Sequence, residues 1–199
     1  MAQNGNGSTT VAATMYLAHL AGIKVFVTGG IGGVHRGAES TFDISADLTE
    51  LSRTPVAVIS AGVKSILDIP KTLEFLETMG VPVVSYGTEW FPDFFTSNSG
   101  LKAPFKADTP EECARIIEGN DILKMKNGLI FAVPVPSDKE ANQEQIQSAI
   151  TQSLAEAEAK GVKGALITPF LLKRVNELTG GESSASNVEL IKNNAKIGG

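Results

Sequence analysis

The chain has 199 residues, of which 42% are hydrophobic and 20% are charged, and its formal net charge is −5. This composition suits one globular domain spanning residues 1–199 with a buried core, and a second full domain is not expected. No run of lysine and arginine could follow a nucleic-acid backbone, and no apolar run approaches the roughly 20 residues that cross a bilayer. We therefore expect neither nucleic acid nor a membrane as a partner.

In chain order, the predicted elements follow from short apolar runs that stop at glycine or proline and from longer runs flanked by helix-capping residues. They are a helix at residues 8–21 with Ser8 or Thr9 as its cap, strands at 23–28 and 55–60, a helix at 72–79, a strand at 81–86, a helix at 109–118, a strand at 128–135, a helix at 138–160, a short strand at 162–168, and helices at 169–178 and 187–197. This alternation predicts an α/β fold with a mainly parallel sheet that is buried on both faces.

The main irregular segment, residues 88–108, holds five aromatic residues among turn formers. We favour a packed surface loop, and a lid or a subunit contact is the alternative.

The cellular location is predicted from the start of the chain and from its cysteine content. Residues 1–7 contain no basic stretch followed by an apolar segment, so they do not resemble a secretory signal. The single cysteine, Cys113, excludes an internal disulfide and fits a reducing compartment. No basic group stands immediately beside its thiol, so we expect an ordinary buried cysteine rather than a nucleophile. The chain is expected to be intracellular, either cytoplasmic or peroxisomal, and not secreted.

Two glycine-rich segments are candidate anion sites. Residues 5–10 lead into the first helix, where unpaired backbone N–H groups would face an anion, although a plain helix cap has the same pattern. Residues 28–37 follow a strand and include His35 and Arg36 as cationic donors. Their spacing matches neither the dinucleotide-binding pattern nor a Walker lysine loop. A phosphate or sugar site is our interpretation of this segment, and a structural turn is the alternative.

Two carboxylates, Asp43 and Asp47, stand on either side of Ser45. At alternate positions of an extended segment, their side chains would point the same way. Oxygen ligands with open positions suit Mg²⁺ or Mn²⁺ held partly through water. The same pattern is common in turns, so the residues alone leave both interpretations open.

Lys64 follows the strand predicted at residues 55–60 and has small and apolar neighbours. Open α/β sheets bind ligands at the carboxyl ends of their strands. Desolvation at that edge would favour a neutral amine, which can condense with an aldehyde. A solvent-exposed loop lysine fits the sequence as well. The only two histidines, His19 and His35, form no Ser-His-Asp or Cys-His nucleophile pattern.

Four motifs occur in order and at close spacing, namely residues 9–14 (TTVAAT), 28–37 (TGGIGGVHRG), 43–48 (DISADL) and 60–68 (SAGVKSILD). Together they resemble the pseudouridine-5'-phosphate glycosidase family, also called the indigoidine-synthase-A-like family. The resemblance covers essentially the whole chain, with further matches at residues 168–172, 187–188 and 193–195.

The resemblance implies a three-layer α/β/α sandwich with a mainly parallel, mixed sheet, and a homotrimer. It implies a lyase, classed with the carbon–oxygen hydro-lyases, that reversibly cleaves the C–C glycosidic bond of pseudouridine 5'-phosphate. The products would be uracil and ribose 5-phosphate. The implied cofactor is Mn²⁺ or another divalent cation.

Roles for single residues also come from the resemblance. Lys64 would be the nucleophile that forms a Schiff base with C1' of the ring-opened sugar, and Asp43 would hold the metal through water. The positions expected to bind the substrate are Val11, Thr28, His35, Ser45, Ala46, Asp47 and Asn187.

The chain also departs from the family pattern. Members carry a general-acid glutamate and a further lysine upstream of the threonine motif, and neither has a counterpart here. We therefore expect a chain that lacks the family's N-terminal third, with an unpaired sheet edge and weakened or absent turnover. The alternatives to an enzyme are a catalytically impaired sugar-phosphate-binding remnant or regulatory subunit of the same family, and a poorly folded fragment.

Overall fold

The computed structural model describes residues 9–199, apart from the side chain of Ala165. The expected cap at Ser8 and most of the glycine segment at residues 5–10 lie outside this range. Helix α1 (Val11–Leu20) follows Thr10, whose hydroxyl accepts the N–H of Ala13 at 3.1 Å. The cap is therefore a threonine of the expected motif, one residue later than predicted.

Five strands form one sheet in the order β1-β2-β5-β3-β4, and all four strand pairs are parallel. Among residues 9–199, the antiparallel pairing of a mixed sheet occurs only as isolated bridges in loops. The strands are β1 (Val25–Val27), β2 (Ala57–Ser60), β3 (Val83–Tyr86), β4 (Phe105–Ala107) and β5 (Leu129–Ala132).

Both faces of the sheet are apolar, which explains why the strands are continuous hydrophobic runs. In β2, Val58 belongs to one buried cluster, whereas Ala57 and Ile59 belong to another. Strand β5 repeats this alternation, with Ile130 in the first cluster and Phe131 in the second. Each face therefore needs its own layer of helices.

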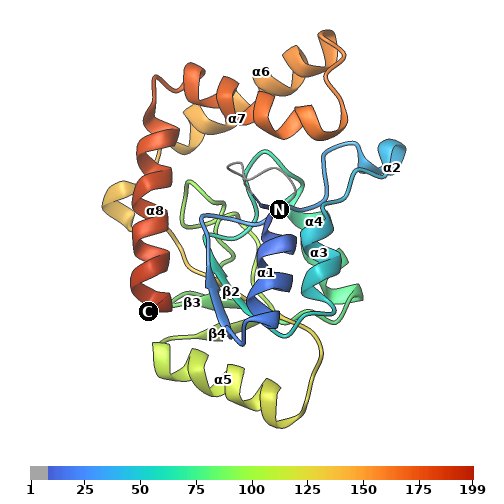
Figure 1. Ribbon diagram of the computed structural model, residues 1–199. Helices are drawn as coiled ribbons and strands as arrows, with labels where there is room; N and C mark the ends of the chain where they lie inside the picture. The colour runs from blue at the N-terminus through green and yellow to red at the C-terminus, as the bar shows by residue number, and fades with distance from the viewer. Residues whose placement is uncertain (1–8) are drawn as a thin grey trace, which may run out of the picture.

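Helices supply those two layers, so the predicted three-layer α/β/α sandwich is confirmed (Figure 1). Helices α1, α3 (Ala46–Leu51) and α4 (Ile69–Thr78) contribute to the first cluster. Helices α5 (Pro110–Ile122) and α8 (Glu182–Gly198) contribute to the second. Helix α8 lies so close to β1 that a Cβ atom at Gly198 would be 2.4 Å from Val27 Cγ2.

A pair of helices, α6 (Gln143–Ala159) and α7 (Ile167–Leu178), lies together at one end of the sheet (Figure 1). Two 3₁₀ turns, η1 (Ser137–Lys139) and η2 (Gly164–Leu166), precede them. The short helix α2 (Ala38–Thr41) projects from the same end of the molecule. The α6–α7 pair therefore stands over the loops that leave the strands.

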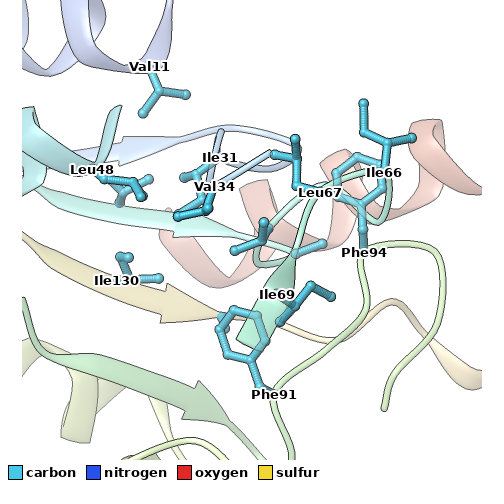
Figure 2. Packing of buried hydrophobic residues seen from close by; sticks show 14 of the residues in the cluster. Val11, Ile31, Val34, Leu48, Ile66, Leu67, Ile69, Phe91, Phe94 and Ile130 are labelled. Carbon is cyan, nitrogen blue, oxygen red and sulfur yellow. The ribbon is translucent and has the colours of Figure 1, made fainter. Parts of the chain in front are cut away.

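The loops after β1 and β2 are themselves part of the hydrophobic core. Ile31 and Val34 follow β1, Ile66 follows β2, and all three are at most 4% exposed. Figure 2 shows these side chains gathered with Leu67 and Phe94 around the strand ends. Burial at this density restricts side chains to a few rotamers, so the backbone of these loops is held rigidly.

The structure corrects three sequence predictions. The strand at residues 162–168 is wrong, because Gly164 adopts a φ of +59° and starts the 3₁₀ turn that leads into α7. The helix at residues 138–160 starts only at Gln143, after a cap by Asn142. Strand β4 was missed within the irregular segment 88–108, because it has only three residues and two of them are exposed.

Strand β1 is an edge of the sheet that residues 9–199 form, and its side chains are half-buried. Exposed apolar side chains lie on the neighbouring helix α1 and just after it, at Tyr16, Leu17, Leu20 and Ile23. An edge strand of the sheet is thus accompanied by exposed apolar side chains in this part of the chain. None of the helices formed by these residues has the length and apolar character needed to cross a membrane.

Candidate active site

A cleft of about 600 Å³ lies beyond the carboxyl ends of β1 and β2. This is the edge at which parallel sheets bind ligands. The start of α1 and the glycine loop line one part of it, and α7 and α8 line another. Seven residues expected at the site line this cleft, namely Val11, Thr28, His35, Ser45, Asp47, Lys64 and Asn187.

Asp47 joins the start of α1 to the glycine loop within one wall of the cleft. Its Oδ1 accepts the N–H of Ala12 at 2.8 Å, and its Oδ2 accepts the N–H of Gly32 at 2.8 Å. Its side chain is available for this because Ser45 caps α3 and directs Asp47 into the first helical turn. Both carboxylate oxygens therefore accept hydrogen bonds from the backbone. These two bonds limit what Asp47 can contribute as the substrate ligand that the sequence predicted. The residue holds the start of α1 against the glycine loop.

The glycines of this loop are required by close packing. A Cβ atom at Gly32 would be 2.2 Å from Ser45 Oγ, and one at Gly30 would be 2.4 Å from the Phe94 ring. Neither position has a positive φ, so backbone strain is not the reason. Close packing therefore explains these two glycines, and both also line the cleft.

Lys64 lies in a loop that is held against the loop after β1. Its backbone N–H donates to the carbonyl of Ile31 at 3.2 Å, and Val63 forms a parallel bridge with Ile31. The Lys64 side chain is half-buried and lines the cleft. A rigid backbone therefore presents a primary amine at the carboxyl end of β2. The alternative interpretation, a solvent-exposed loop lysine, does not account for this half-buried position.

Helix α8 contributes a wall of the cleft and also holds the glycine loop in place. Asn187 lines the cleft, with its Oδ1 only 3.3 Å from where a Cβ atom at Gly29 would stand. Two turns further on, the fully buried Asn194 donates from Nδ2 to the carbonyl of Thr28 at 2.9 Å. The two asparagines therefore couple the last helix to the end of the first strand.

Two expected site residues do not line the cleft. Ala46 is exposed on α3, and Asp43 lines a neighbouring cavity together with His35, which borders both spaces. The Asp43 Oδ2 atom lies 3.9 Å from His35 Nδ1. Asp43 and Asp47 are not directed together, because α3 begins between them.

A divalent ion fits these residues only as a largely hydrated ion. Among residues 9–199, no group of three or more His, Cys, Asp or Glu side chains is placed to share a metal. The side chain of Asp43 is 37% exposed, so one accessible carboxylate is available. Mg²⁺ and Mn²⁺ accept such sites when water and substrate oxygens complete the shell.

Several residues that line the cleft were not predicted from the sequence. Phe94 and Phe95 come from the irregular segment, and the others come from α7 and α8, namely Thr168, Leu172, Asn176, Ser183, Ser184 and Ile191. Thr168 and Leu172 belong to a segment that resembles the family, but that segment has no chemical signature of its own. Phe94 and Phe95 are at most 5% exposed, so the packed-loop interpretation is confirmed for them.

The family model described as indigoidine synthase A like protein matches residues 1–199. The chain therefore belongs to the indigoidine synthase A-like family. The pseudouridine-5'-phosphate glycosidase of Arabidopsis thaliana is 58% identical over 198 residues, covering 100% of this chain and 60% of that protein. The enzyme of the same name from Caldanaerobacter subterraneus is 52% identical, covering 100% of this chain and 64% of that protein. The chain thus spans about three fifths of the length of these relatives.

Two solved structures share the fold with a TM-score of 0.89 each. One is the prealnumycin C-glycosynthase AlnA in complex with ribulose 5-phosphate, 35% identical, covering 99% of this chain and 65% of that one. The other is an indigoidine synthase A-like protein from Thermotoga maritima, 38% identical, covering 99% of this chain and 64% of that one.

Proposed function

We propose that this chain belongs to an enzyme that reversibly cleaves the C–C bond between uracil and the sugar of pseudouridine 5'-phosphate, with Lys64 as the nucleophile. The observation that carries this proposal is the placement of Lys64 in the cleft at the carboxyl ends of β1 and β2. The names of the relatives, pseudouridine-5'-phosphate glycosidase, support the substrate class, and so does the sugar phosphate held by the glycosynthase.

The chemistry of the substrate calls for an amine. A C-glycoside has no heteroatom leaving group, so acid-assisted hydrolysis through an oxocarbenium ion would be slow. As the sugar ring opens, the C1'–O4' bond breaks and O4' takes a proton, while the Lys64 amine loses a proton and bonds to C1'. The C1'–C5 bond then breaks as a proton reaches C5 of uracil, and the nitrogen lone pair forms the iminium at C1'. Water hydrolyses this iminium, which releases ribose 5-phosphate and restores the amine.

Groups of the cleft suit the phosphate and the sugar. His35 supplies a nitrogen donor, and Thr28 and Asn187 supply polar contacts. The backbone N–H groups of Ala12 and Ala13 at the start of α1 are already paired, with Asp47 and Thr10, so the phosphate needs the side chains as well. A divalent ion at Asp43, for which we propose Mn²⁺, would supply positive charge near His35.

Activity depends on a group that can donate the proton that C5 of uracil receives. Among residues 9–199, Asp47 is the only acidic residue that lines the cleft, and both of its oxygens accept backbone N–H groups. This observation favours the second candidate function, a sugar-phosphate-binding chain without turnover.

We propose a homotrimer as the assembly, and the exposed apolar side chains Tyr16, Leu17, Leu20 and Phe42 offer area for subunit contacts.

The decisive experiment measures uracil released from pseudouridine 5'-phosphate with Mn²⁺, by chromatography. Release is expected to disappear in Lys64→Ala and to persist in Lys126→Ala, which removes an exposed lysine before β5. Borohydride added with ribose 5-phosphate should attach a reduced sugar phosphate to Lys64. Equal adduct formation in Lys64→Ala would rule out the Schiff base.

The two candidate functions differ when uracil is not released. A binding chain should still melt at a higher temperature with ribose 5-phosphate, because a ligand of the folded state alone stabilises it. An unchanged melting temperature at millimolar ligand would contradict both functions. Light scattering of the same sample measures the mass of the assembly.

A further inference from the structure

A turn formed by residues 93–96 lies directly behind the cleft. Asp93 and Thr96 exchange backbone hydrogen bonds of 3.0 and 3.2 Å, and Phe94 between them has a φ of +52°. This left-handed conformation is uncommon for an aromatic residue and needs support from its surroundings. The turn directs Phe94 and Phe95 into the cleft, where their rings meet edge to face at 4.7 Å.

The turn is attached to the loop that carries Lys64. Ser65, the next residue along the chain, is 1% exposed, and its Oγ donates to the carbonyl of Asp93 at 2.9 Å. Arg36 Nη2 donates to the carbonyl of Ser65 at 3.3 Å from the other side. The backbone at Lys64 therefore cannot shift without moving the turn.

The side chain of Asp93 attaches the turn to α6. Its Oδ2 accepts the Nε2–H of Gln147 at 3.0 Å, and the backbone N–H of Ala141 donates to the carbonyl of Phe95 at 3.1 Å. The Oδ1 atom is buried and has no hydrogen-bond partner among the described residues. Asp93 is 7% exposed, so its carboxylate is held in the interior with a single side-chain donor.

A small cavity of about 380 Å³ lies beside Asp93. The titratable groups that line this cavity with Asp93 are Arg36 and Asp68, and Gln147 is the polar neighbour from α6. Burial raises the pKa of the Asp93 carboxyl to about 6, and the Ser65 hydroxyl, the Arg36 charge and the Gln147 donor oppose this rise. A buried carboxylate with one unpaired oxygen costs stability, and such groups are typically found where function needs them.

We propose that Asp93 is a positioning residue for Lys64, whose neutral carboxyl group fixes the turn and the Lys64 loop against α6. This inference rests on the proposed role of Lys64 as the nucleophile. Ionisation leaves a buried negative charge with one unpaired oxygen in the packed arrangement, which costs free energy. The loop then loosens, and the accessibility of the Lys64 amine changes with the ionisation of a residue that does not line the cleft.

The test measures reductive methylation of single lysines by formaldehyde and a borohydride reagent, read by peptide mass spectrometry from pH 5 to pH 8. The ratio of the Lys64 rate to the rate of the exposed Lys102 cancels the pH dependence of the reagent. We expect this ratio to change about fivefold with a midpoint near pH 6, the factor that corresponds to about 1 kcal/mol.

Variants separate Asp93 from its neighbours. Asp93→Asn keeps an oxygen that can accept from Gln147 but cannot titrate, so its ratio should stay flat at the acid value of the unmodified chain. Gln147→Leu removes a donor that stabilises the ionised form, so the midpoint should move to higher pH. Asp68→Asn, in the same cavity, is the matched control and should keep the inflection.

A flat ratio in the unmodified chain, or an inflection that survives in Asp93→Asn, would overturn the proposal. A midpoint that Gln147→Leu leaves in place would do the same. No sugar phosphate takes part in this measurement, so failure of the Schiff-base proposal shows only in the borohydride adduct with ribose 5-phosphate. The two failures are thus distinguishable.

Discussion

The Asp47 carboxylate accepts a hydrogen bond of 2.8 Å from the backbone N–H of Gly32, fifteen residues earlier in the chain. The same carboxylate accepts the N–H of Ala12, so one side chain joins α3, the glycine loop and the start of α1. These three segments form one wall of the cleft.

Replacing Asp47 by alanine should destabilise the fold by about 3 kcal/mol, because two backbone donors lose a charged acceptor. Urea denaturation measures this change. Asp43→Ala is the control, since its side chain is partly exposed, and it should cost less than about 1 kcal/mol. Equal midpoints for Asp47→Ala and the unmodified chain would show that the two hydrogen bonds contribute nothing net.

Gly32→Ala should destabilise the chain by about 2 kcal/mol or more, because its Cβ atom would stand 2.2 Å from Ser45 Oγ. The matched control is Gly119→Ala within α5, where nothing lies within 4 Å of the added atom. That change should stabilise by up to about 1 kcal/mol through helix propensity. Thermal melting of both variants gives the comparison, and the same sign for both would contradict the packing argument.

Asp93→Asn should change how stability depends on pH. The folded pKa of about 6 lies above the ordinary value of 3.8, so the folded state binds this proton more tightly than the unfolded state does. Stability from this group is therefore present below about pH 4 and is lost as the pH rises through 6. The asparagine variant should gain up to about 3 kcal/mol on the unmodified chain between pH 4 and pH 8. Denaturation at both pH values tests this, and parallel pH profiles would exclude a raised pKa.

Mn²⁺ should raise the melting temperature of the unmodified chain but not that of Asp43→Asn. An ion that binds only the folded state adds about 2.7 kcal/mol at one hundred times its dissociation constant. Asp138→Asn, which alters an exposed acidic residue, should keep the shift. A shift that persists in Asp43→Asn would place the ion elsewhere.

Local pattern was enough to predict the central sheet and one wall of the site. A strand is predicted at residues 55–60, and β2 forms within this range, so Lys64 is expected near the carboxyl edge of the sheet with the glycine segment beside it. These relationships span only a few residues, and parallel strands present their carboxyl ends at a common edge. Four of the five strands and most helices were found in this way.

The second wall could not be predicted from chemistry-bearing patterns. Thr168 and Leu172 reach the cleft because α7 packs against α6 and α8, more than 100 residues after Lys64. Asn194 looked like an ordinary helix residue, yet it donates to a carbonyl 166 residues away. The structural role of Asp47 could not be predicted either. Nothing in the sequence distinguishes a carboxylate that accepts backbone N–H groups from one that binds a ligand.

The hydrogen bond from Asn194 to Thr28 has a consequence for the order in which the cleft forms during synthesis. Strand β1 leaves the ribosome early, whereas α8 is the last of the described helices to do so. Until α8 docks, the glycine loop lacks its tether and the cleft lacks Asn187. A partly synthesised chain can thus build most of its sheet before α8 is made, and the wall of the cleft that α8 supplies is added only afterwards.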